Sequence, residues 1–431
     1  MPSTRLSGTS KHRMSSSVAM HIDHLAARPS RTSAKRYPWK VVHACELARE
    51  VLSLVEGQLA AGMRPSLLTP GGFGATRSFV DSKRAEARQI SLLQMWNHVR
   101  EWRKLLNDSA AECSSEIIHA HSFAAGMAAV RASSGVVYQL KQTVERLAAA
   151  NGNQDENSWL ARSFRVAEQF VLTRAAAVVV HNHRQRLACL ERGVAAGSVF
   201  LIPEPIDPHL LEQECDRRWL ETITDSSPET VSFLIPSLPE IPSWDERDAL
   251  LRWMRVISVL RQEHPNIKFV FVGNAAAADH LRNVASTCGL SGLISVLDDE
   301  YRDQATACAD VVICDREHAD DAYALEAMAR GRALLAADVE QHREFTADGH
   351  GCLWYRAGEV GDIAQRASFL AGNPQFRRAL AAAGREHCLA TRSAEVVGAQ
   401  YDAVYRLAFA RRKGRDSSTP KTQLIPLQVG S

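Results

Sequence analysis

The stretch "CDREHADDAYALEAMARGRALLAAD", residues 314–338, decides the fold of this chain. It starts at the end of the apolar segment "DVVICD", crosses a loop rich in acidic residues and enters a short helical segment, "AYALEAMARG". A second apolar segment, "RALLAAD", follows at once. Apolar strands that alternate with helices are typical of a parallel sheet that is buried on both faces.

The same alternation extends outward from this stretch in two series. The first begins at Trp39 and predicts the strands "KVVH", "PSLLTP", "EIIHAH", "GVVYQL", "AAAVVVHN" and "VFLIPEPID", with a long helix at about 78–107. The second begins at "VSFLIPSL" and continues through "IKFVFVGN", "LISVLDD", "DVVICD" and "RALLAAD". The sequence therefore predicts an α/β protein with two doubly wound, Rossmann-like parallel-sheet domains that face a central cleft. In such folds ligands bind at the carboxyl ends of the strands.

Composition sets the expected domain boundaries. The first 40 residues carry eight Lys or Arg and one acid, and residues 203–230 hold four prolines with little periodicity. We predict a disordered basic tail (1–38), an N-terminal domain (39–207), a linker (208–230), a C-terminal domain (231–394), a closing helix (395–412) and a disordered tail (413–431).

Charge and cysteine usage exclude several classes of protein. Outside the basic first 40 residues, 43 basic residues stand against 48 acidic ones, so the folded part lacks the basic surface of a nucleic-acid binder. No run reaches the roughly 18 apolar residues of a membrane span, which leaves only peripheral contact with a membrane open. The nine cysteines form no C-x-x-C pair, which favours reduced, buried thiols and a cytoplasmic location.

Several motifs in order resemble the family 4 group of GT-B glycosyltransferases, the retaining glycosyl transferases group 1. They are "IIHAHSF", "AAAVVVHNHRQRLACLERGVAAGSVFLIPEPID", "HPNIKFVFVGN", "CADVVICD", "ALEAMARGRALLAAD", "EFTADGHGCLW" and "RRALAAAGREHC". The resemblance covers residues 39–410. It implies a metal-independent, hexosyltransferase-type enzyme of carbohydrate metabolism, such as polysaccharide biosynthesis. The nucleotide-diphosphate sugar would be a substrate, with no bound cofactor, and the acceptor a glycan or a lipid-linked molecule.

The resemblance also implies donor-binding residues in the C-terminal domain. Glu326 matches the family Glu that accepts hydrogen bonds from the ribose hydroxyls, although a Glu here could instead support Arg330 at the i,i+4 position of a helix. His318 stands where the family has a second Glu, and Glu317 lies one residue out of register. The family loop of Gly-aromatic-Gly is replaced by Ala319, Asp320 and Asp321, and Asp at a helix start is typical of an N-cap.

A further departure concerns the cations that neutralise the diphosphate. The family has Gly-Arg after the first strand of this domain and a Lys shortly after it, whereas this chain has Pro236 and Ser237 and no Lys nearby. Arg247, near the start of the next helix, is the expected substitute. Preorganised cations at the leaving diphosphate contribute much of the rate acceleration in such reactions. Because this chain lacks them at the family positions, its donor motifs are degenerate.

In the N-terminal domain the expected catalytic residues are His121 and Lys141, with His119 and Glu46 on the acceptor side. His119 and His121 end one strand, so their side chains point to the same face. Lys141 stands where the family has a His that contacts the donor sugar, and Glu46 replaces part of a Gly-rich turn. The alternatives are rim residues, or a metal site in which His181 and His183 join the first two histidines.

Two functions follow from these observations. One is a family-4-like glycosyltransferase with an altered donor site. The other is a catalytically inactive GT-B scaffold that binds a partner or a glycan, since the glycines and cations that hold a diphosphate are absent together.

Overall fold

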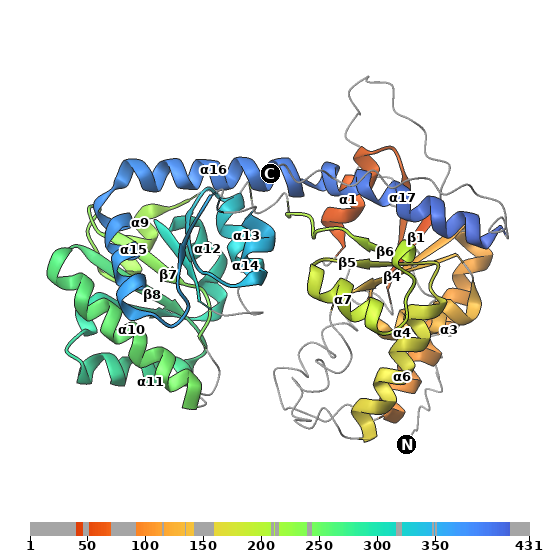
Figure 1. Ribbon diagram of the computed structural model, residues 1–431, viewed down its shortest axis with the longest axis horizontal. Coiled ribbons are helices and arrows are strands. Elements are labelled where there is room, and N and C mark those ends of the chain that lie inside the picture. Colours follow the sequence, from red (N-terminus) through yellow and green to blue (C-terminus); the bar gives the residue numbers. More distant parts are fainter. Residues whose placement is uncertain are drawn as a thin grey trace, which may run out of the picture. The chain divides into compact units, whose positions relative to one another are not determined.

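The computed structural model describes residues 40–45, 51–69, 92–113, 116–133, 135–141, 159–207, 211, 215–238, 244–315, 321–346, 349 and 351–413. Contacts divide the chain into two units, the first made of residues 1–202 and 400–431 and the second of residues 203–399. Figure 1 shows a sheet with helices packed around it in each unit.

The described part of the first unit contains a six-stranded sheet. Its strands are β1 (Lys40–Ala44), β2 (Arg64–Leu68), β3 (Ile117–Ala120), β4 (Val136–Leu140), β5 (Ala177–Val180) and β6 (Val199–Leu201). Its helices are α1 (Leu52–Ala60), α3 (Leu92–Cys113), α4 (Phe123–Ala132), α6 (Trp159–Arg174), α7 (His183–Glu191) and η2 (Ala196–Ser198), together with most of α17 (Ala394–Arg412).

The second unit repeats this plan. Its strands are β7 (Val231–Ile235), β8 (Ile267–Val272), β9 (Ile294–Leu297), β10 (Val311–Cys314), β11 (Ala333–Ala337) and β12 (Cys352–Tyr355). Its helices are α9 (Arg217–Thr224), α10 (Trp244–Glu263), α11 (Ala275–Thr287), η3 (Ser291–Leu293), η4 (Asp299–Tyr301), α12 (Arg302–Cys308), α13 (Asp321–Ala329), α14 (Glu340–Thr346), α15 (Val360–Gly372) and α16 (Pro374–Arg392).

The order of the strands locates the ligand-binding edge of each sheet. The first sheet has the order β2-β1-β3-β4-β5-β6 and the second β12-β11-β10-β7-β8-β9, and the pairings between their strands are parallel. The direction of winding therefore reverses between β1 and β3 in the first sheet and between β7 and β10 in the second. Open parallel sheets bind ligands beyond the carboxyl ends of the strands at such points.

These observations confirm the expected fold class and refine several elements. The helix expected at 78–107 ends later, at Cys113, and its first part lies outside the described residues. A capped helix, α9, forms within the segment predicted as a linker, where the Asp216 side chain accepts a hydrogen bond from the Trp219 amide. The two predicted tails lie almost wholly outside the described residues. Across the described helices, none has both the length and the apolar character needed to cross a membrane.

Apolar residues on both faces of each sheet account for the packing. Phe233 of β7 and Phe269 of β8 are fully buried and stack with ring centroids 5.0 Å apart. Polar residues start the helices that follow the strands: the Ser122, Asn182 and Asn274 side chains accept hydrogen bonds from amides in the first turns of α4, α7 and α11. These N-caps satisfy free amides in the first turn of each helix, and they fix the start of the helix close to the carboxyl end of the preceding strand.

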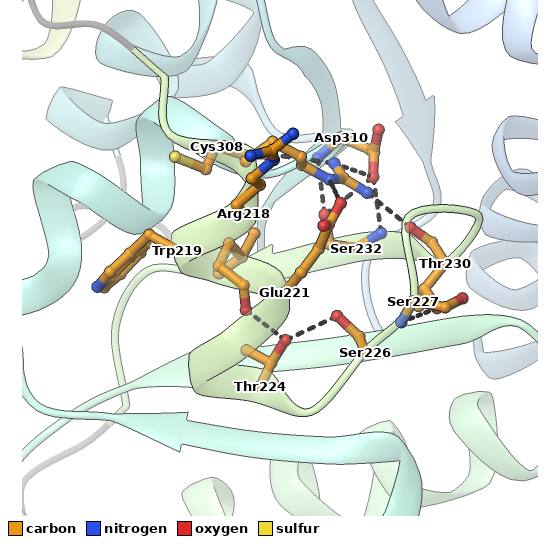
Figure 2. A network of polar contacts seen from close by, with 12 residues as sticks. Arg218, Trp219, Glu221, Thr224, Ser226, Ser227, Thr230, Ser232, Cys308 and Asp310 are labelled. Atoms are coloured by element: carbon orange, nitrogen blue, oxygen red, sulfur yellow. Dashed lines mark hydrogen bonds and ion pairs between the residues drawn. The ribbon is translucent and has the colours of Figure 1, made fainter.

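A polar network fastens α9 to the amino ends of β7 and β10 in the second unit (Figure 2). Asp310 Oδ2 accepts hydrogen bonds from Arg217 Nη1 at 2.7 Å and from the amide and hydroxyl of Ser232, both at 2.9 Å. Arg217 also donates to the carbonyl oxygens of Thr230 and Cys308. The carboxylate thus satisfies donors from two elements that are far apart in the sequence.

We expect Asp310→Ala to lower the free energy of unfolding of the second unit by about 2–4 kcal/mol, because it strips a carboxylate from a partly buried Arg217 and from the Ser232 amide. Urea unfolding monitored by hydrogen exchange in β7 measures the change. Asp279→Ala is the matched control, since the Asp279–Arg282 pair is exposed and should contribute less than about 1 kcal/mol. Equal losses in the two variants would contradict the prediction.

Candidate functional site

Three buried histidines meet at the winding reversal of the first sheet. The register between β1 and β3 places His43 beside His119, and His121 follows β3 with its amide bonded to the carbonyl oxygen of Ala44. His43 Nδ1 lies 2.8 Å from His121 Nε2, and the ring centroids of His119 and His121 are 4.1 Å apart. His119 and His121 thus point to the same face, as their spacing predicts.

Gln58 and Tyr405, which lie on helices, form hydrogen bonds with two of these histidines. His43 Nε2 donates to Gln58 Oε1 at 2.9 Å, since an amide oxygen only accepts, and Gln58 Nε2 donates to the Tyr405 hydroxyl at 2.8 Å. That hydroxyl lies 3.0 Å from His119 Nδ1. A hydrogen-bonded chain therefore connects β1 and β3 with α1 and α17, and all five side chains are buried.

Burial determines the charge of these imidazoles. It lowers the pKa of His43 to about 4, and it lowers the pKa of His119 and of His121 well below the usual value. Neighbouring His and Lys141 side chains lower the last two further. All three rings are therefore neutral at pH 7, and each has one nitrogen with a lone pair.

Lys141 and His181 lie at the same edge of the sheet, beyond β4 and β5. Lys141 directly follows β4, is half-buried and is close enough to influence the pKa of His119 and His121. His181 uses both ring nitrogens in contacts, with the Ile202 carbonyl oxygen at 2.8 Å and with Gln139 Nε2 at 2.9 Å. The structure thus brings the predicted residues His119, His121 and Lys141 together.

In the second unit, Glu326 lies in α13 and is 10% exposed. Its Oε1 is 2.8 Å from Nη2 of Arg330, one turn along the helix, in an ion pair. Burial raises the pKa of the Glu326 carboxyl to about 7 although Arg330 opposes the rise, and Asp303 adds to it. The predicted i,i+4 contact between Glu326 and Arg330 is therefore present. A ribose bound at Glu326 would have to share the carboxylate with Arg330.

Arg302, at the start of α12, brings a cation to this edge. Its Nε donates to the Pro236 carbonyl oxygen at 2.9 Å, directly beyond β7, and its guanidinium carbon lies 5.1 Å from the ring centroid of Tyr323. Asp299 accepts a hydrogen bond from Arg302 Nη2. The positive charge of Arg302 lowers the pKa of Glu326. Sequence reasoning missed Arg302 because nothing in the sequence connects α12 with the end of β7.

Other predicted residues are not placed. Glu46, Glu317 and His318 lie outside the described residues, and Arg247 belongs to α10 without a described side chain. Asp321 is the first residue of α13, and its predicted capping contact also falls outside what the structure describes. The role of each stays a prediction.

His43 was also missed, although a signal existed. The predicted strands "KVVH" and "EIIHAH" each carry a histidine near the carboxyl end, and the register of β1 with β3 puts His43 and His119 side by side. Only the order of the strands, however, shows that β1 and β3 are neighbours.

The raised pKa of Glu326 predicts a pH-dependent stability. The folded state holds the proton more tightly than the unfolded state, whose carboxyl titrates near 4.5. Stability from this group is complete below pH 4.5 and is lost as the pH rises through about 7. Relative to Glu326→Gln, the wild type should lose about 1–3 kcal/mol of unfolding free energy between pH 5 and pH 8.

Denaturant unfolding of both proteins at several pH values measures this difference. The control is Glu359→Gln, which changes an exposed carboxyl in the same unit. A constant difference between wild type and Glu326→Gln would show that the carboxyl is not desolvated in the folded protein.

Comparisons with known proteins show which family the sequence matches. Two family models match the chain, one described as a glycosyl transferase 4-like domain over residues 47–205 and one as glycosyl transferase-like over residues 304–401. Together they cover more than half of the 431 residues. No curated protein matches the sequence significantly.

Solved structures are similar in fold. A glycosyltransferase from Rickettsia africae ESF-5 has a TM-score of 0.60 at 12% identity, over 86% of this chain and 99% of that chain. Sucrose-phosphate synthase from Thermosynechococcus elongatus has a TM-score of 0.58 at 17% identity, with the same coverage. Anabaena HepE, solved in complex with UDP-glucose, has a TM-score of 0.57 at 15% identity, over 84% of this chain and 98% of that chain.

The first model falls almost wholly within the first unit and the second almost wholly within the second unit. The similar structures show the fold at identities too low to show more. With these matches, the chain belongs to the family-4-like, group 1 glycosyltransferases and has their GT-B fold.

Proposed function

We propose that this protein transfers a sugar from a nucleotide-diphosphate sugar to a glycan or lipid-linked acceptor. In this reaction the bond between the anomeric carbon and the diphosphate oxygen breaks, and the acceptor oxygen takes its place on that carbon. The acceptor loses its proton, and the nucleoside diphosphate leaves with the electron pair. The family assignment supports glycosyl transfer in general, and the residues at the two sheet edges support this form of it.

The observation that carries the proposal is the pair of charges at the edge of the second sheet. Glu326 offers a carboxylate for ribose hydroxyls, and Arg302 offers a cation beside the end of β7. Parallel sheets of this type bind nucleotides at that position. Arg302, with Arg247 as a second candidate, would replace the missing Gly-Arg and Lys cations, so that the diphosphate is neutralised by side chains rather than by a metal ion.

On the acceptor side, the proposal assigns contact with the transferring sugar to His121 and Lys141. Lys141 is half-buried at the carboxyl edge of the first sheet, next to the histidine cluster. Its ammonium group suits a phosphate or a sugar hydroxyl. His119 and Glu46 would complete the acceptor side. Retention of the anomeric configuration is proposed from the family alone.

Uridine nucleotides are the first donors to test. Among proteins of similar fold, HepE has been solved with UDP and with UDP-glucose. We propose a cytoplasmic location from the cysteines, since all eight that the structure describes are free thiols and six of them are buried.

Calorimetric titration with a panel of UDP-, GDP- and ADP-sugars tests the proposal. At least one donor should bind saturably, and Glu326→Ala should weaken that binding by about tenfold or more, as expected for the loss of hydrogen bonds to a charged group. Glu359→Ala, at an exposed position of the same unit, is the control. A folded protein that binds none of the donors would contradict the proposal.

A second candidate function is an inactive scaffold that binds a glycan or a partner. It is favoured by the internal partners of both charges, since Arg330 pairs with Glu326 and Asp299 pairs with Arg302. A donor would have to compete with these carboxylates and cations. Turnover above background with any donor and acceptor would eliminate this candidate.

A further inference from the structure

The histidine cluster of the first unit has the composition of a metal site. One ring nitrogen from each of His43, His119 and His121 can be chosen so that all three lie within 4.8 Å of one another. The side chains are 0%, 0% and 5% exposed. Three neutral imidazoles are a frequent ligand set for Zn²⁺ and similar transition ions.

The outer hydrogen bonds leave inner nitrogens available. Gln58 accepts from His43 Nε2, which leaves the lone pair on His43 Nδ1, and Tyr405 contacts His119 Nδ1, which leaves His119 Nε2. Ligating histidines usually have such a partner on their other nitrogen, which fixes the tautomer and the ring orientation. Helices α1 and α17 supply these two partners, so the surrounding fold orients the rings inward.

Two buried atoms of the cluster lack a hydrogen-bond partner. They are His119 Nε2 and His121 Nδ1, and Gln139 Oε1 nearby also lacks a partner of good geometry. The contact between the Gln139 and His119 side chains nevertheless has hydrogen-bonding character, which raises the pKa of His119. Buried polar atoms without partners are rare and often indicate an ion or a water molecule. A cation would engage His119 Nε2 directly.

We propose that His43, His119 and His121 bind one divalent transition ion of the zinc type. His119 Nδ1 then donates to the Tyr405 oxygen. The proton between His43 Nδ1 and His121 Nε2 moves to His121 Nδ1, and the ion takes its place. This assignment makes His121 a metal ligand, so that of the two residues proposed above to contact the sugar, Lys141 keeps that role. Metal binding itself does not require the transfer reaction.

The rings are close to the required spacing. Tetrahedral zinc with nitrogen ligands at about 2.0–2.1 Å needs ligand nitrogens about 3.4 Å apart. His43 Nδ1 and His121 Nε2 start at 2.8 Å, and one ring nitrogen of each of the three histidines lies within 4.8 Å of the other two. Ring rotations bring the ligand nitrogens to this spacing, and tetrahedral coordination by three imidazoles leaves one position for a water molecule or a substrate oxygen.

The test measures metal binding by the full-length chain, purified without a histidine tag and stripped with a chelator. Titration with Zn²⁺ against a chromophoric chelator should give one tightly bound ion per chain, and X-ray absorption should show three imidazole nitrogens at about 2.0 Å. His43→Gln and His119→Gln should each weaken this site by about 100-fold or more, because the loss of only an outer partner costs about 10–100-fold.

His181→Gln is the matched control, because His181 lies at the same edge but spends both ring nitrogens on other contacts. It should retain the site. If the variants do not fold, X-ray absorption on the wild-type protein still tests whether three imidazole nitrogens coordinate the ion. An ion with fewer than three imidazole ligands, binding that His43→Gln leaves unchanged, or a buried water molecule with no ion would overturn the proposal.

Discussion

Gly351→Ala is expected to unfold the second unit or to destabilise it by about 4 kcal/mol or more. Gly351 directly precedes β12 with φ at +83°, and a Cβ atom there would lie 2.0 Å from Gly384 Cα and 2.4 Å from Gly384 N in α16. Both contacts are with backbone, which cannot rotate away as a side chain can. The substitution therefore forces α16 away from the sheet.

Two glycine variants calibrate this result. Gly384→Ala meets Gly351 O at 3.1 Å, so a smaller loss of about 1–2 kcal/mol is expected. Gly361→Ala, in the first turn of α15, meets nothing within 4 Å and should be neutral or slightly stabilising. Thermal unfolding and hydrogen exchange in β12 and α16 measure all three. A Gly351→Ala protein as stable as Gly361→Ala would refute the close approach of these backbones.

Arg302→Ala is expected to lower the rate of sugar transfer by about 100-fold, because a preorganised cation at a leaving diphosphate is typically worth that much. Arg302→Lys should lose less, since it keeps the charge but cannot reproduce the fixed guanidinium bond to Pro236 O. Turnover with the donor and acceptor found by the panel measures both variants, and calorimetry separates donor affinity from rate.

Arg282→Ala is the matched control, because Arg282 in α11 also pairs with an Asp three residues earlier but is 56% exposed. It should leave transfer unchanged. If Arg302→Ala retains both wild-type donor affinity and turnover, Arg302 serves only to tie α12 to the end of β7, and the diphosphate cation must come from elsewhere.

The fold was predictable from the sequence because its signals are local. Alternating apolar strands and helices gave two parallel sheets, and the order of motifs indicated the family, which two family models confirm. The spacing of His119 and His121 correctly placed both side chains on one face. Helix α9 was missed because its eight residues lie in a stretch dominated by prolines and charges.

The site was less predictable because its members come from distant segments. His43 joins His119 only through the pairing of β1 with β3, Tyr405 reaches the cluster from α17, and Arg302 reaches Pro236 across 66 residues. These contacts depend on the order of strands and on how the helices pack. Neither property is encoded in the spacing of residues along the chain.

The sequence by itself determined the α/β class, the two-domain plan, the family and the position of Glu326 on a helix beyond a strand. The tertiary structure decided that Glu326 is desolvated and paired with Arg330, and that three histidines, from β1, from β3 and from just after β3, share one buried site. The physical reason is the distance along the chain over which each kind of interaction acts. Hydrophobic periodicity acts over a few residues, whereas burial, charge pairing and ligand geometry arise only when remote segments exclude water together.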